Sequence, residues 1–353
     1  MPAEHIIYDA YSKHLKLNGY KVSAFDPCLF YCVNAQEQTY IVIHVDDTFI
    51  FSNTDTAIQR FIDIMQSKFE ITVNDDADTY LGVHLVEDKT TGSIMMHQPK
   101  LIQSLLEMYE AEIKSPPDIA TTKEYQKLLG TLMYITKSRP DIQASISFAA
   151  THSKNPTREH YIQLLKLVEY IKQTKDEGLI INSYEDQSNQ TLQLYCHVDA
   201  SYLSHEDSKS QTGYTLSFGK TGCFYAKSSK QPLVATSSTH AEARALFTLL
   251  QDIIYVVSIC QELSIEIKLP VIVYEDNFPV VQLSNNLAPR AKKCKHFLML
   301  INYIKEQVEA GIIKIEHVDT DQNLADILTK ILTGSLFFDK AKQLLGTPPV
   351  QCK

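Results

Sequence analysis

Residues 192–200 read Leu-Gln-Leu-Tyr-Cys-His-Val-Asp-Ala, and every second position from Leu192 to Val198 is apolar. This two-residue period predicts a β-strand with one face turned to a hydrophobic core. Asp199 shares the opposite face with His197. The strand therefore carries an acid near its middle, where a purely structural role is awkward.

The sequence after this strand predicts the order β-β-β-α-β-α. A long helix is expected at 239–263, and an apolar strand at 271–275 follows it. That order suits a mixed sheet with helices packed on its faces. The other expected strands are 212–218, 222–228 and 312–318, and the other expected helices are 278–285, 296–310 and 323–332.

The sequence before this strand also mixes helices and strands, so we expect the fold class α/β (α+β). From 124 to 175 the signals are helical, and the polar stretch 184–190 is typical of a linker. The expected helices of the first part are 5–17, 56–69 and 99–110, and its expected strands are 28–33, 39–45, 48–52, 80–86 and 93–97.

The composition excludes several classes of protein. The chain has 353 residues, 44% hydrophobic and 21% charged, which excludes wholesale disorder. No run approaches about 20 apolar residues, so no membrane span is expected, and the N-terminus shows no secretory signal. Seven scattered cysteines without a CxxC pair predict neither a disulfide framework nor a structural zinc site. We therefore expect an intracellular protein. The net charge of −9 argues against indiscriminate coating of nucleic acid.

Four acids stand out in the second half: Asp199, Glu242, Asp276 and Asp326. Taken singly, each has an ordinary explanation. Acids near the start of a helix complement the helix dipole, and an aspartate at the end of a strand often caps the helix that follows. Taken together, they can converge on one sheet edge, where clustered carboxylates need compensating cations. Two Mg²⁺ ions about 4 Å apart are the usual solution, and they serve phosphodiester hydrolysis.

These acids lie in motifs that resemble the ribonuclease H domain of copia-type LTR retrotransposon polyproteins. The motifs are Asp199-Ala200, Ser-Ser-Thr-His-Ala-Glu at 237–242, Glu275-Asp276-Asn277, Lys295-His296, and Asp-Gln-Asn-Leu-Ala-Asp-Ile-Leu-Thr-Lys at 321–330.

The resemblance implies a ribonuclease H-like mixed sheet that cleaves the RNA strand of RNA–DNA hybrids. It implies a two-ion Mg²⁺ site, with Mn²⁺ as a substitute, in which Asp199 contacts both ions. Glu242 and Asp276 would share one ion, and Asp326 would hold the other. The basic run near 290–296 would border the hybrid, although most such runs are simply solvated surface. Its residues are Arg290, Lys292, Lys293, Lys295 and His296.

The first half resembles the reverse transcriptase of the same polyproteins. Asp46 and Asp47 stand between two apolar strands. By pattern alone this pair is a hairpin turn, but by resemblance the two aspartates bind metal. The expected domains are a partial reverse transcriptase palm (1–112), a helical thumb and connection (113–189), the ribonuclease H-like domain (190–345) and a tail (346–353).

Some positions depart from the family. His44 stands where an aromatic residue is usual, His240 stands where a glutamate is usual, and the chain contains no tryptophan. The family's third polymerase aspartate is expected upstream of Met1, so we expect no polymerisation by this chain alone. His317 could aid product release, although a surface histidine at a strand end is the simpler interpretation.

Two classes of function remain open. The first is a hybrid-cleaving ribonuclease whose partner is RNA–DNA hybrid, with other Pol subunits as further candidates and no membrane partner. The second is a decayed or domesticated fragment that binds nucleic acid or packs against a full-length polymerase. Either would act inside the cell, in the cytoplasm within virus-like particles or in the nucleus.

Overall fold

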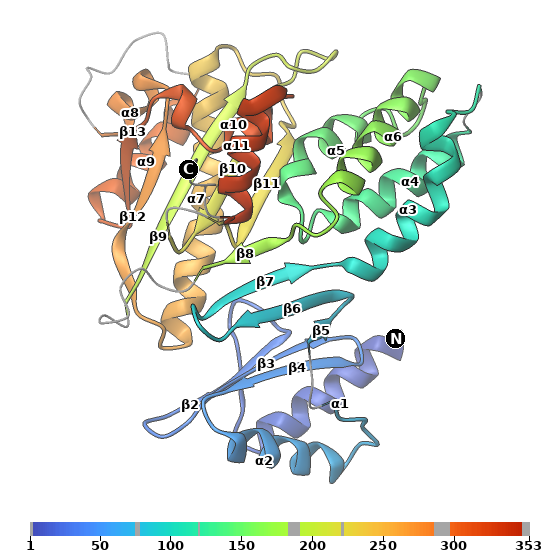
Figure 1. Ribbon diagram of the computed structural model, residues 1–353. Coiled ribbons are helices and arrows are strands. Elements are labelled where there is room, and N and C mark those ends of the chain that lie inside the picture. Colours follow the sequence, from blue (N-terminus) through green and yellow to red (C-terminus); the bar gives the residue numbers. More distant parts are fainter. Residues whose placement is uncertain are drawn as a thin grey trace. The chain divides into compact units, whose positions relative to one another are not determined.

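The computed structural model describes residues 3–74, 78–118, 121–182, 191–219, 222–285 and 297–347. Contacts divide the chain into two compact units. Unit 1 comprises residues 1–81 and 254–267, and unit 2 comprises residues 82–253 and 268–353. Figure 1 shows the elements of both.

Unit 1 contains an antiparallel sheet in the order β1-β2-β3-β4. Its core joins Leu15 of one helix, Phe61 and Met65 of another, and Phe30 and Ile41 of the sheet. The expected helices 5–17 and 56–69 and the expected strands 28–33, 39–45 and 48–52 are confirmed. They are α1 (Ala3–Leu17), α2 (Asp55–Gln66), β2 (Leu29–Val33), β3 (Gln38–His44) and β4 (Asp47–Ser52). β1 (Lys21–Val22) was not predicted, and the strand expected at 80–86 is interrupted after β5 (Thr79–Tyr80), because Leu81 and Gly82 turn the backbone with positive φ.

The end of a long helix, α7 (Ser238–Glu262), also belongs to unit 1. The Glu262 carboxylate accepts hydrogen bonds from the Ser23 hydroxyl and, at 2.8 Å, from the Ala24 N–H. The Tyr40 hydroxyl donates to the Leu263 carbonyl at 3.3 Å. Residues far apart in the sequence therefore fix this helix end to the first sheet.

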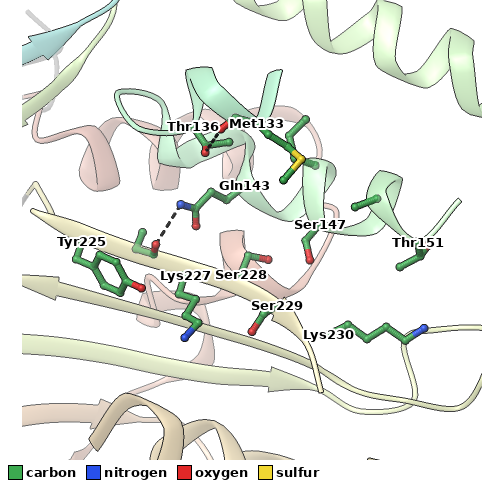
Figure 2. A pocket seen from close by; sticks show the side chains of 13 residues that line it. Met133, Thr136, Gln143, Ser147, Thr151, Tyr225, Lys227, Ser228, Ser229 and Lys230 are labelled. Atoms are coloured by element: carbon green, nitrogen blue, oxygen red, sulfur yellow. Dashed lines mark hydrogen bonds between the residues drawn. The ribbon is translucent and has the colours of Figure 1, made fainter. Parts of the chain in front are cut away.

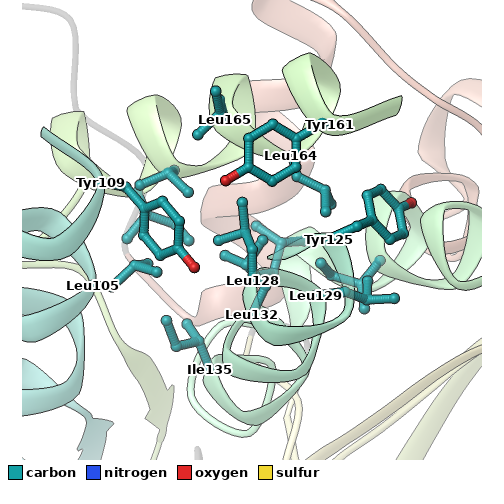
Figure 3. Close-up of a cluster of buried hydrophobic side chains, with 14 of the residues drawn as sticks. Leu105, Tyr109, Tyr125, Leu128, Leu129, Leu132, Ile135, Tyr161, Leu164 and Leu165 are labelled. Atoms are coloured by element: carbon teal, nitrogen blue, oxygen red, sulfur yellow. The ribbon is translucent and has the colours of Figure 1, made fainter. Parts of the chain in front are cut away.

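Unit 2 begins with the antiparallel strands β6 (Val83–Asp88), β7 (Ser93–His97) and β8 (Leu179–Ile181). The strand β8 was not predicted, because three residues carry no period and the strand is defined by pairing with β7. Four helices follow β7 and share a core of leucine, isoleucine and tyrosine side chains (Figure 3). They are α3 (Pro99–Lys114), α4 (Thr122–Ile135), α5 (Gln143–Ala150) and α6 (Arg158–Gln173).

A fully buried ion pair closes this helical region. The Arg139 guanidinium donates to both oxygens of Asp141, at 3.0 and 2.7 Å, and neither side chain is exposed. The Tyr170 hydroxyl donates to the same carboxylate at 2.7 Å. Because Arg139 and Tyr170 both donate to the Asp141 carboxylate, the core tolerates these buried charges.

The second sheet of unit 2 has the order β11-β10-β9-β12-β13, antiparallel from β9 to β11 and parallel between β12 and β13. The expected mixed α/β architecture with flanking helices is therefore confirmed. The strands are β9 (Leu192–Ser201), β10 (Gln211–Ser217), β11 (Tyr225–Lys230), β12 (Ile267–Glu275) and β13 (Ile313–His317).

Helices cover this second sheet. Figure 1 shows α7 behind the strands and the short α10 (Asp326–Thr329) in front, followed by α11 (Gly334–Leu345). The helix expected at 323–332 is thus shorter than predicted, because Asn323 turns its side chain back to the Val198 carbonyl at 2.8 Å. α11 was not predicted. The remaining helices are α8 (Phe278–Ser284) and α9 (Leu298–Glu309).

α7 is also long and apolar enough to cross a membrane, by length and composition only. A buried core helix meets the same criterion, and Ala243, Leu246 and Leu250 of α7 are fully buried. The apolar character of α7 is therefore explained by packing inside the protein.

Candidate metal centre

The acids of the second sheet come from four different elements. Asp199 lies in β9 and is 2% exposed. Glu242 lies near the start of α7, and Asp326 is the first residue of α10; each is 5% exposed. Asp276 follows the end of β12 and is half-buried. The structure therefore brings the four predicted acids of the ribonuclease H-like region into one part of unit 2.

A fifth acid, Glu275, joins them and is completely buried. The carboxylates form two overlapping sets. One oxygen each from Asp199, Asp276 and Asp326 lies within 4.8 Å of the others, and the same holds for Glu242, Glu275 and Asp276. Asp276 is thus the acid common to both sets. The expectation that Asp199 contacts both ions stays a prediction.

The packing of α10 on the sheet sets the distance between Asp326 and Asp199. Gly213 of β10 pairs with Asp199, and a Cβ built there would lie 2.6 Å from Thr329 Cγ2 and 2.7 Å from Leu328 Cβ. Only glycine allows this close approach. The Thr329 hydroxyl then donates a hydrogen bond to the Asp199 carboxylate.

Two lysines face the acids of α10 and β9. Lys330 Nζ donates to Asp326 Oδ1 and lies 3.6 Å from Asp199 Oδ1. Lys340 Nζ lies 3.5 Å from Asp326 Oδ2 and donates to the Asn323 carbonyl at 2.6 Å. Two ammonium groups do not balance five carboxylates, so the site keeps an excess of negative charge.

Burial, together with this excess of negative charge, changes the protonation of the acids. Burial raises the pKa of Asp199 to about 6, although Lys330 and Thr329 partly oppose the shift. Burial, followed by the charge of Glu275, raises the pKa of Glu242 well above its ordinary value. Burial likewise raises the pKa of Glu275, although the backbone N–H of Asn277 opposes it. An additional cation would therefore stabilise the ionised form of each of these acids.

The donor set fits hard divalent cations. All the grouped ligand atoms are carboxylate oxygens, which Mg²⁺ and Mn²⁺ prefer. In the described part of the chain, Glu242 Oε2 and Glu275 Oε2 are buried and have no hydrogen-bond partner. The residues present would therefore supply oxygen ligands to a bound cation, and the cation would in turn give the two unpartnered oxygens a partner.

The predicted polymerase aspartates occupy a different kind of place. Asp46 lies with Val45, which has a positive φ of 57°, in the exposed turn between β3 and β4, and Asp47 is the exposed first residue of β4, paired with His44 of β3. Among the described residues, neither belongs to a group of three potential metal ligands. Their metal-binding role stays a prediction.

Two further predictions have different outcomes. Arg290, Lys292, Lys293, Lys295 and His296 lie outside the described residues, so the contact with a hybrid is untested. His317 is exposed at the end of β13, with its ring edge-on to Phe278 at 5.6 Å. This placement agrees with a surface histidine at a strand end.

Sequence reasoning missed Glu275, Gly213 and the two lysines as parts of the site. The signal for Glu275 was present, because Val271, Val273 and Glu275 share one face of β12. A glycine inside a strand pattern also signals close approach of another segment. Nothing local signals that Lys330 reaches Asp199, 131 positions away in the chain.

A cavity of about 590 Å³ lies elsewhere in unit 2, between α4, α5 and β11 (Figure 2). Its wall carries hydroxyl groups, and the Gln143 side chain crosses it to donate to the Ala226 carbonyl at 3.0 Å. None of the five acids lines it. The carboxylate site is therefore separate from this cavity.

No protein-family model matches the chain. The Retrovirus-related Pol polyprotein from transposon RE2 of Arabidopsis thaliana is 25% identical over 348 residues, which covers 94% of this chain and 23% of that protein. The corresponding polyprotein from transposon TNT 1-94 of Nicotiana tabacum is 26% identical over 364 residues, which covers 96% of this chain and 27% of that protein. The chain is a homologue of copia-type Pol polyproteins. It spans about a quarter of the length of these relatives.

Solved structures similar to this Pol homologue come from two groups. LC11-RNase H1 has a TM-score of 0.32 at 17% identity, covering 39% of this chain and 94% of that one. The foamy viral protease-reverse transcriptase in complex with RNA/DNA hybrid has a TM-score of 0.42 at 15% identity. The similarity covers 84% of this chain and 37% of that one.

Proposed function

We propose that this Pol homologue hydrolyses the RNA strand of RNA–DNA hybrids at the five-carboxylate site. The observation that carries the proposal is the pair of overlapping carboxylate sets that meet at Asp276. The relationship to Pol polyproteins, which covers more than nine-tenths of the chain, supports it.

The residues of the site would have two roles, cation binding and positioning of the ligands. Asp199 and Asp326 would hold one cation and Glu242 would hold the other, with the half-buried Asp276 common to both sets. When bound, two divalent cations supply Lewis acidity toward the attacking and leaving oxygens of a phosphodiester. The Thr329 hydroxyl orients the Asp199 carboxylate, and Gly213 keeps α10 close enough for Asp326 to reach the site.

Recognition of the substrate would depend on shape and charge. The basic residues at 290–296 would contact phosphates, so binding would weaken with salt and ignore sequence. The 2′-OH of the RNA strand would distinguish a hybrid from duplex DNA. We expect no primer extension, since no third carboxylate among the described residues joins Asp46 and Asp47.

The test is incubation of the purified chain with a labelled RNA–DNA hybrid, in Mg²⁺ and in EDTA. We expect cleavage in Mg²⁺ that leaves 5′-phosphate and 3′-OH ends, with single-stranded RNA and duplex DNA intact. Asp199→Asn should lower the rate by about a hundredfold or more, because it removes a cation ligand. Asp321→Asn, an exposed position near α10, is the matched control and should retain the rate.

Two outcomes would contradict the proposal. Cleavage that persists in EDTA would exclude a divalent cation site, and an unchanged rate in Asp199→Asn would place the chemistry elsewhere. If the folded chain bound the hybrid without cutting it, the alternative of a non-catalytic nucleic-acid-binding fragment would be supported instead.

A further inference from the structure

Glu275 is a buried acid whose presence packing does not explain. It ends β12 on the same face as the buried Val271 and Val273, and none of its side chain is exposed. An apolar residue would continue that face. A carboxyl group at this position carries a desolvation cost of several kcal/mol when ionised.

The hydrogen bonding of this acid is incomplete. Glu275 Oε1 accepts the N–H of Asn277 at 2.9 Å, but Oε2 has no partner in the part of the chain that the structure describes. Glu242 Oε2 is in the same situation. The ion pairs of Lys330 and Lys340 go to Asp199 and Asp326 and not to these two glutamates.

The geometry around the two free oxygens suits one small cation. Ligand oxygens of Glu242, Glu275 and Asp276 lie within 4.8 Å of one another. An ion that holds oxygens at about 2.0–2.6 Å separates its ligands by at most about 4–5 Å. Asp276 is half-buried, so it leaves a route from solvent to the set.

We infer that Glu242, Glu275 and Asp276 form a divalent cation site in which Glu275 is a ligand in addition to the four predicted acids. This inference rests on the proposed function for the role of the ion, but not for its binding. The three carboxylates favour an oxygen-seeking ion such as Mg²⁺ or Mn²⁺ over a soft metal. A proton shared between Glu242 and Glu275 is the competing explanation of the free oxygens, and it predicts no dependence of cation binding on Glu275.

The experiment is a titration of the full chain with Mn²⁺ alone, without nucleic acid, followed by the electron paramagnetic resonance signal of free Mn²⁺. We expect two bound ions in the wild type. Glu275→Gln should weaken one of them about tenfold or more, and Asp326→Asn should weaken the other. Glu306→Gln, which removes one charge from an exposed position of α9, is the matched control and should leave both unchanged.

Thermal unfolding provides a second readout. Without metal, Glu275→Gln should unfold at the wild-type temperature or above it, because the substitution removes a buried carboxyl group whose ionised form has no cation beside it. Its stabilisation by Mn²⁺ should be smaller. If Glu275→Gln does not fold, Glu275→Asp keeps the charge but withdraws the oxygen by one methylene, and it should also weaken one ion.

Two results would overturn the inference: Mn²⁺ affinities in Glu275→Gln within about twofold of wild type at every site, or a wild-type chain that binds no Mn²⁺. These results are distinguishable from failure of the proposed function. A chain that cleaves hybrid while Glu275→Gln binds Mn²⁺ normally contradicts only the inference. A chain that loses one Mn²⁺ in Glu275→Gln but never cleaves hybrid contradicts only the proposed function.

Discussion

Gly213→Ala tests whether close packing of α10 sets the geometry of the carboxylate site. The added Cβ would meet Thr329 Cγ2 at 2.6 Å and Leu328 Cβ at 2.7 Å, whereas ordinary contact begins at 3.4 Å. α10 must therefore retreat by about 0.8 Å. Overpacking of this kind costs about 1–3 kcal/mol of the free energy of unfolding. A displacement near 1 Å in a catalytic group costs up to about a hundredfold in rate.

We expect Gly213→Ala to fold, with hybrid cleavage reduced about ten- to a hundredfold at saturating Mg²⁺. Urea unfolding measures the stability, and steady-state cleavage measures the rate. Gly130→Ala in α4 is the matched control, since a Cβ there meets nothing within 4 Å, and it should gain up to about 1 kcal/mol without loss of rate. A Gly213→Ala variant that loses stability but keeps the wild-type rate would show that the position of α10 does not control the chemistry.

Three other changes have definite expected results. Because burial raises the folded pKa of Asp199 above its ordinary value, to about 6, its ionisation destabilises the metal-free fold as the pH rises from about 4 to about 6. Asp199→Asn should therefore unfold at higher urea than wild type near pH 7.5 and match it below about pH 4, and a constant difference would contradict this. Lys330→Met removes the ammonium group that pairs with Asp326, so Mn²⁺ should bind about tenfold more tightly. The Mn²⁺ titration followed by electron paramagnetic resonance measures this, and weaker binding would show that the lysine assists the cation. Arg139→Met leaves Asp141 unpaired in the core and should cost about 3–5 kcal/mol in urea unfolding, and a loss below about 1 kcal/mol would be inconsistent with the buried pair.

The strands and helices with a clear period could be predicted from the sequence. The alternation in 192–200 correctly placed Asp199 on the face opposite Val198, and the helix expected at 239–263 matches α7. Acids at the ends of such elements could also be expected to converge, because the order of the elements limits where strand and helix ends meet. The structure places oxygens of Asp199 and Asp326, and an oxygen of Glu242, close to Asp276, and the role of these acids as metal ligands stays a prediction.

The remaining features depend on contacts between distant segments. The strand β8 exists because it pairs with β7, and a three-residue run has no period to reveal this. The length of α10 depends on the bond from Asn323 to Val198, and the charge balance depends on Lys330 reaching Asp199. Such pairings have no local pattern, so only the folded chain shows them.

The end of α7 has a consequence for how this protein can evolve. Glu262 binds Ser23 and Ala24, and the carbonyl of Leu263 accepts from Tyr40, so residues more than 200 positions apart share one set of hydrogen bonds. A substitution at Ser23 leaves part of the Glu262 carboxylate without its donor, which favours a compensating change at 262. Recombination that exchanged the first 81 residues between divergent elements would separate these matched partners. Positions 23 and 262 should therefore covary among related sequences, although 239 positions separate them.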